Sequence, residues 1–269
     1  MLYALRLLTG FLPVAYALVF FLYFRLLFVE EEPRRSSFAS QALALTAGLH
    51  LGALLLRGFL LNHCPLATGW EIISFLALAL VGTHLIVERI TGYMSPGVPV
   101  VGLAVVLQTI SSSLLRYDVV VSPTLRQWEV PLHAVFGICG HAGFFTAACY
   151  SLLYLVLHRL IKQRRLDQVW AALPPLETMY RMSRWAVLCG LVFMSLAIGS
   201  GLAQAASRGL VPKPIFSSGI SWVAFSGLLL VSRLRRVTGH GFTWAALLSA
   251  MLDLALLFTT ETLHHDHFL

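Results

Sequence analysis

Two histidines on one apolar segment are the residues whose type and spacing most readily suggest chemistry. His133 and His141 lie in a run that opens at Pro131 and continues to Leu157. If the run is helical, their eight-residue spacing places them on roughly the same side, about 12 Å apart along the axis. Neutral imidazole is the commonest protein ligand for metals, and an ionisable side chain within a bilayer usually serves a function. The pair is therefore a candidate metal or cofactor site.

The composition shows what must surround these histidines. Of the 269 residues 58% are hydrophobic and only 12% are charged, whereas charged residues make up about a quarter of a soluble domain. The chain is therefore predicted to be an all-α polytopic integral membrane protein, forming one transmembrane domain over residues 1–269. Its net charge of +7 fits basic loops on lipid headgroups. Membrane lipid is the expected partner, and nucleic acid is not.

The apolar runs set the number of helices that must position the histidines. A bilayer span needs about 20 apolar residues, and the sequence offers about eight such runs. The predicted spans are 5–28, 38–61, 70–87, 99–115, 132–160, 185–206, 215–234 and 242–263.

The distribution of Lys and Arg predicts the orientation. With the N-terminus outside, the inner loops hold 13 of the 19 basic residues, six of them within 159–184. Cytoplasmic loops carry the excess of positive charge, so both termini are predicted to be non-cytoplasmic. The short loops fit the inner membrane of a bacterial cell.

A middle set of histidines is predicted near mid-bilayer. His50 and His141 each lie about ten residues from a helix end, with His84 as a weaker member. A haem between helices needs one or two axial imidazoles, apolar walls and a cation for its propionates. Arg57 lies seven residues after His50, on the same helix face, where it could meet a propionate. The alternative is that each histidine only hydrogen-bonds neighbouring groups.

An outer set comprises His133 and the histidines of the C-terminal tail, with His264 as the member expected to contribute to a site. These residues could form outer ligands or the point where haem enters. The alternative for the tail is non-specific metal binding.

Other chemistry is less well supported. The four cysteines form no CxxC pair, and no nucleophile elbow, HExxH motif, Walker loop or paired carboxylates occur. An enzyme is therefore not favoured. Proton-coupled transport would prefer several acids at mid-depth, and Asp253 is the one clearly predicted there.

Several segments, taken in order, resemble the cytochrome c assembly superfamily of CcsA-like proteins, and within it the shorter HemX/YpjD type. Segments 50–58, 64–66 and 70–77 look like that family's opening: a histidine, an apolar helix, Pro-Leu, a Glu and a second apolar helix. His133 with Gly137 and Gly140 looks like its histidine-led helix, and LPPLE at 173–177 is similar to the linker of HemX-like members. The resemblance covers most of the chain from about residue 49.

This resemblance implies a function. Haem-handling relatives hold haem between two external histidines, which would map to His133 and His264, and His50 matches their intramembrane histidine. The stretch 201–214 keeps Pro212 and Lys213 of the relatives' outer loop and lacks its tryptophans. That departure argues against an external haem platform, and leaves an internal haem held through His50 or a scaffold that binds none.

The leading hypothesis is therefore a membrane protein that binds or handles haem b and assists cytochrome c maturation, haem-enzyme assembly or a respiratory complex. Its partners would be haem and an apocytochrome, a haem-pathway enzyme or that complex. The rival is a cofactor-free structural or regulatory subunit that docks a partner through its basic inner loop. A transporter that depends on Asp253 is the third hypothesis.

Overall fold

The computed structural model describes residues 2–28, 38–117, 129–164, 173–208, 215–234 and 239–265, and these are mostly helical. Within these ranges the side chains of 129–130, 208, 215–217 and 258–265 are not described. No strand occurs in the described residues, so the predicted all-α class is confirmed.

The described residues form eight long helices and two short 3₁₀ segments. They are α1 (Leu2–Arg25), η1 (Leu26–Phe28), α2 (Phe38–Leu61), α3 (Gly69–Thr91), η2 (Ser95–Gly97), α4 (Val98–Leu114), α5 (Glu129–Lys162), α7 (Leu176–Arg208), α8 (Ile215–Leu234) and α9 (Gly239–His265). Within these residues, seven helical segments are long and apolar enough to cross a membrane. The part of α8 whose side chains are described, Ser218–Leu234, is also apolar. The chain is therefore a multi-pass membrane protein, as predicted.

The largest difference from the predicted spans lies at the start of α7, which begins at Leu176 rather than at residue 185. The carbonyl oxygen of Pro175 accepts hydrogen bonds from the amides of Thr178 and Met179. The helix therefore starts directly after the two prolines. The added turns are polar on one side only, because Met179 and Met182 are fully buried. Hydropathy alone misses such an amphipathic extension.

Side chains at both ends of α3 fix where this helix starts and stops. The Thr68 hydroxyl accepts a hydrogen bond from the Glu71 amide, and the Glu71 carboxylate accepts one from the Thr68 amide, which together form a capping box. Gly92 closes the other end at φ 79°, a left-handed conformation that glycine adopts without steric cost. The capping box also fixes the position of the Glu71 carboxylate.

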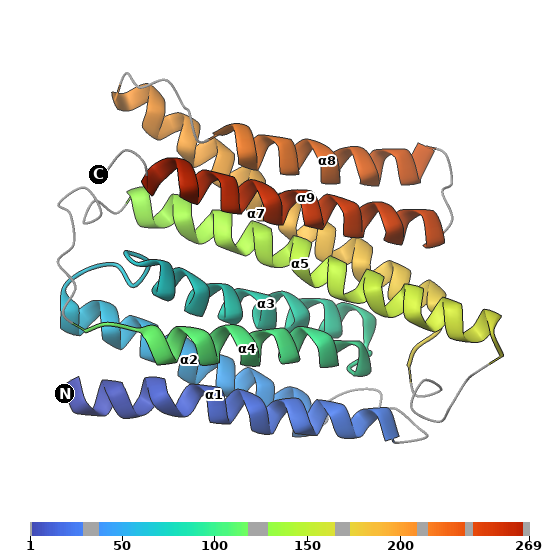
Figure 1. Cartoon of the computed structure of the whole chain (residues 1–269), viewed down its shortest axis with the longest axis horizontal. Helices are drawn as coiled ribbons and strands as arrows, with labels where there is room; N and C mark the ends of the chain where they lie inside the picture. Colours follow the sequence, from blue (N-terminus) through green and yellow to red (C-terminus); the bar gives the residue numbers. More distant parts are fainter. Residues whose placement is uncertain are drawn as a thin grey trace.

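The helices form two four-helix halves packed side by side, α1–α4 and α5 with α7–α9, and successive helices run in opposite directions (Figure 1). The halves meet mainly through α3 against α5, with α7 also touching α3. α1 begins and α9 ends at the same end of the bundle, which we call the terminal end (Figure 1). That both ends of the helical bundle lie together agrees with the predicted topology, while the side of the membrane stays a prediction.

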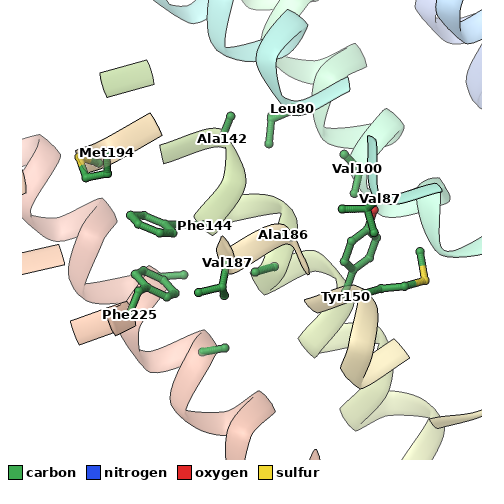
Figure 2. Packing of buried hydrophobic residues seen from close by; sticks show 14 of the residues in the cluster. Leu80, Val87, Val100, Ala142, Phe144, Tyr150, Ala186, Val187, Met194 and Phe225 are labelled. Atoms are coloured by element: carbon green, nitrogen blue, oxygen red, sulfur yellow. The ribbon is translucent and has the colours of Figure 1, made fainter. Parts of the chain in front are cut away.

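The core of the second half depends on close approach of α5 to α7. A Cβ atom on Gly143 would lie 2.5 Å from Gly190 Cα, so both positions need glycine for the backbones to come together. Beside this contact, the rings of Phe144 and Phe225 are stacked with centroids 3.9 Å apart, as Figure 2 shows. The core continues towards the first half through Leu80 of α3 (Figure 2).

Candidate functional site

His50 connects all four helices of the first half. This fully buried side chain has its Nδ1 3.0 Å from the Tyr16 hydroxyl of α1 and its Nε2 2.9 Å from the Ser74 hydroxyl of α3. Ser74 donates to Oε1 of Gln108 on α4, and the Gln108 amide donates to Ser112. Because both ring nitrogens are engaged, His50 has no free nitrogen for a metal in this arrangement.

The direction of these bonds fixes the tautomer of His50. Ser74 has one hydroxyl proton and gives it to Gln108, so its oxygen can only accept from His50. The Nε2 atom of His50 therefore carries a proton, and Nδ1 accepts from Tyr16. The resulting ring is neutral, which suits an apolar setting.

Arg57 lies two turns further along α2 and forms a buried ion pair. Its Nε donates to Glu71 Oε1 at 2.6 Å, and the two side chains are 1% and 0% exposed. Nη2 donates to the carbonyl of Arg116, and the guanidinium lies 5.0 Å from the ring centroid of Tyr117. No hydrogen-bond partner of Nη1 is found among the described residues. The contact of Arg57 with a haem propionate stays a prediction. A propionate there would compete with the Glu71 carboxylate for the Arg57 guanidinium.

His50 and Arg57 are brought together at one small cavity. The cavity measures about 10 Å³, and its polar walls also include Glu71, Ser74 and Gln108. A space of this size accommodates about one water molecule, so haem does not fit between these residues as they stand. These side chains and their hydrogen-bonded neighbours Thr9, Tyr16 and Ser112 are called the His50 cluster below.

A second buried polar group, which the sequence analysis did not predict, lies towards the other end of the first half. Tyr23 donates to Glu88 Oε2 at 2.6 Å, and His84 Nδ1 lies 2.6 Å from the Tyr150 hydroxyl. His84 Nε2 lies 3.2 Å from Glu88 Oε2, without hydrogen-bond geometry. These four residues are called the His84 cluster. The contact of His84 with Tyr150 joins the two halves of the bundle.

His141 belongs to the second half and is paired with Asp253. Its Nδ1 lies 2.9 Å from Asp253 Oδ2, and the side chains are 13% and 0% exposed. Within the described part of the chain, no partner is found for His141 Nε2 or for Asp253 Oδ1. A metal-binding histidine almost always donates its other ring N–H to a carboxylate or carbonyl. The pair thus leaves one nitrogen available and holds the ring in place.

His133 is held in a similar way near the terminal end of α5. Its Nδ1 donates to the carbonyl of Ala197 at 2.8 Å, and its ring lies against the backbone of Gly201. His133 therefore contacts α7, whereas His141 contacts α9. Eight residues leave an angular offset of about 80° at 3.6 residues per turn, so the two rings do not face one shared iron atom.

The remaining predicted ligand cannot be placed. His264 lies in the last turns of α9, and its side chain is outside the described residues. Among those residues no group of three or more His, Cys, Asp or Glu side chains could hold a metal ion. A haem site, which needs only one or two axial ligands, is the metal centre that these histidines can still form.

The sequence carried signals for the groups that were missed. His84 and Glu88 are four residues apart and so share a helix face, and Tyr16 and Tyr23 are seven apart on α1. Spacing can place such residues on one face. It does not reveal that the faces of α1, α3 and α5 meet.

Comparison of the chain with protein-family models and with curated proteins gave no match.

Proposed function

We propose that the chain is a membrane-integral protein that binds or handles b-type haem, with His141 as its main axial ligand. In this proposal it assists cytochrome c maturation, haem-enzyme assembly or a respiratory complex, as a HemX/YpjD-type member of the CcsA-like superfamily. The observation that carries the proposal is the pairing of His141 Nδ1 with the buried Asp253 carboxylate, which leaves Nε2 available.

Each side chain near His141 has a defined part. Asp253 accepts a hydrogen bond from Nδ1–H, which fixes the tautomer and orients the ring. Gly137 lies one turn away on the same helix face, and among the described residues a side chain there would meet Ala197 Cβ of α7 at 4.0 Å. A macrocycle bound to His141 would therefore lie beside α7. When bound, the haem iron would supply redox chemistry or be carried as cargo.

The roles of the two other histidines differ in this proposal. His133, also held at Nδ1 with no partner found at Nε2 among the described residues, would be a separate contact for haem near the terminal end. His50 would be a structural residue, since Tyr16 and Ser74 occupy its nitrogens. The proposal therefore moves the main ligand from His50, which the resemblance favours, to His141.

Absorption spectroscopy of the detergent-purified protein, titrated with haem and then reduced with dithionite, tests this proposal. We expect Soret and α bands in the wild type, their loss in His141→Ala and their retention in His50→Gln. His50→Gln is a matched control because glutamine can accept from Tyr16 and donate to Ser74. If the wild type binds no haem, or if His50→Gln alone removes the bands, the proposed site is wrong.

A second candidate function is a cofactor-free subunit that docks a partner at the end opposite to the terminal end. There α5 extends beyond neighbouring helices (Figure 1), and Arg159 and Lys162 on α5 and Arg164 in the turn after it are exposed. Replacing all three by glutamine should then prevent co-purification of a cytoplasmic partner. Unchanged co-purification of every bound protein would remove this alternative.

A further inference from the structure

The polar groups of the first half form two clusters at different depths, with an apolar layer between them. The His50 cluster lies towards the terminal end, and the His84 cluster lies towards the other end. Tyr16 belongs to the first and Tyr23 to the second. They are seven residues apart on α1, about 10.5 Å along the helix, whereas the hydrocarbon core of a bilayer is about 30 Å thick. The two clusters therefore place polar groups at two depths within the apolar interior of this half.

His50 has the geometry of a relay within its cluster. Each ring nitrogen contacts a hydroxyl group, Tyr16 at Nδ1 and Ser74 at Nε2. An imidazole in this setting can gain a proton at one nitrogen and release one from the other. The two hydroxyls belong to α1 and α3, so the proton would pass across the interior of the four-helix half.

The cavity beside His50 provides the next step towards the terminal end. Arg57 lines it, and its buried Nη1 has no hydrogen-bond partner in the part of the chain that the structure describes. A buried guanidinium N–H without a partner is costly, and a water in the cavity would satisfy it. The groups facing this position are Glu71 of α3, the ring of Tyr117 and, 3.9 Å from Glu71, the imidazole of His63. Such a water could exchange protons with Ser74 and with the terminal end.

The His84 cluster can hold a proton at the other end. The Glu88 side chain is 7% exposed and lies one turn before the end of α3. The groups facing it are Tyr23 of α1, Ser40 of α2 and His84, with Tyr150 of α5 on the far side of the His84 ring. One proton can reside on Glu88 with a neutral His84, or on His84 with an ionised Glu88.

The apolar layer between the clusters is thin and made partly of small side chains. Val19, Ala77, Val81, Val101 and Ala104 are buried there in one cluster of contacts. No ionisable side chain is among them. Protons could cross this layer only on transient water, so passage would be slow and could be controlled by small helix movements.

We propose that α1–α4 transfer protons between the two ends of the bundle, a function separate from haem binding. A proton taken up by Glu88 and His84 crosses the apolar layer on water and reaches His50 Nδ1 as Tyr16 turns aside. His50 then releases its Nε2 proton through Ser74 to the water beside Arg57, and that water passes it to the terminal end. One proton enters and one leaves, and no group is oxidised or reduced.

Proton flux into proteoliposomes loaded with a pH-sensitive dye, driven by a potassium diffusion potential, tests the proposal. We expect the wild type to acidify the vesicles faster than protein-free vesicles do. Glu88→Gln and His50→Gln should both fall to the protein-free rate, because neither glutamine can carry a proton. Since His50→Gln can keep both hydrogen bonds, its loss of flux would not reflect a structural role.

Glu177→Gln is the control variant, because this exposed acid at the start of α7 lies in the other half, belongs to neither proposed site and should keep full proton flux. Helical content and elution profile establish that each variant is folded, and if Glu88→Gln is not folded, His50→Gln decides. A wild-type rate equal to that of protein-free vesicles overturns the proposal, as does full flux in His50→Gln. Either outcome leaves the haem spectra unaffected, so the two proposals fail independently.

Discussion

In the α1–α4 half His50 has hydrogen-bond partners at both ring nitrogens, whereas in the other half the described residues offer His141 and His133 a partner at Nδ1 and none at Nε2. The difference follows from how each half is held together. The first half is connected by polar side chains, including the buried pair of Arg57 with Glu71. A histidine whose two ring nitrogens are both hydrogen-bonded has none left for a metal, whereas a histidine with one unpaired nitrogen can bind one.

The second half achieves its packing through small residues. Gly143 and Gly190 let α5 and α7 come into backbone contact, and the hydroxyls of Ser151 and Ser183 lie 2.9 Å apart across the same pair of helices. Close packing of this kind needs few polar contacts. His133 and His141 of α5 each keep one ring nitrogen for which no partner is found among the described residues.

The largest effect should come from breaking the ion pair of the first half. Glu71→Gln leaves the Arg57 guanidinium buried without its counter-charge, and loss of one partner of a buried pair typically costs about 3–5 kcal/mol. We expect a marked drop in thermal stability, measured by circular dichroism in detergent. Glu177→Gln, an exposed acid at the start of α7, should leave the melting temperature unchanged. Equal melting temperatures for Glu71→Gln and wild type would contradict a first half held by polar contacts.

The matching test in the second half is Gly143→Ala. The new methyl group would overlap Gly190, and forcing α5 away from α7 should lower the free energy of unfolding by about 1–3 kcal/mol. Gly199→Ala is the matched control, because nothing lies within 4 Å of a side chain there. It should be neutral or stabilising by up to about 1 kcal/mol. Equal changes in the free energy of unfolding for the two substitutions would show that close packing of α5 against α7 does not stabilise this half.

Asp253→Asn should weaken haem binding rather than stability. Asparagine cannot act as the anionic acceptor for His141 Nδ1–H, and loss of such a partner typically lowers metal affinity by about 10–100-fold. Haem titration followed at the Soret band measures the change. Glu88→Gln, a buried acid of the first half, should keep the wild-type affinity. An unchanged affinity in Asp253→Asn would indicate that His141 is not the ligand.

The smallest effect is expected for Tyr16→Phe. It removes one hydrogen bond to His50, and such bonds between membrane helices contribute about 0.6 kcal/mol on average. Thermal unfolding should shift slightly, and the haem bands should not change. Tyr93→Phe, at a side chain for which no hydrogen bond is found within the described residues, should have no effect. Loss of haem in Tyr16→Phe would reverse the assignment of the two histidines.

The amino-acid sequence alone determined the class of the protein and most of its helices. A run of about 20 apolar residues can satisfy its backbone in a bilayer only by forming a helix or a closed barrel, so 38–61 and 215–234 were predicted with the bounds that α2 and α8 have. Sequence also identified Arg57 and His50 as neighbours, because seven residues make about two turns of a helix.

The tertiary structure decided what each polar group contacts. Glu71 pairs with Arg57, and both ring nitrogens of His50 are hydrogen-bonded. His141 of α5 pairs with Asp253 of α9. Each of these contacts depends on how the helices pack against one another. Residues 112 positions apart in the sequence, such as His141 and Asp253, leave no periodic trace of their contact. Helical periodicity fixes the face of a residue within its own helix, and only packing between helices fixes which other face it meets.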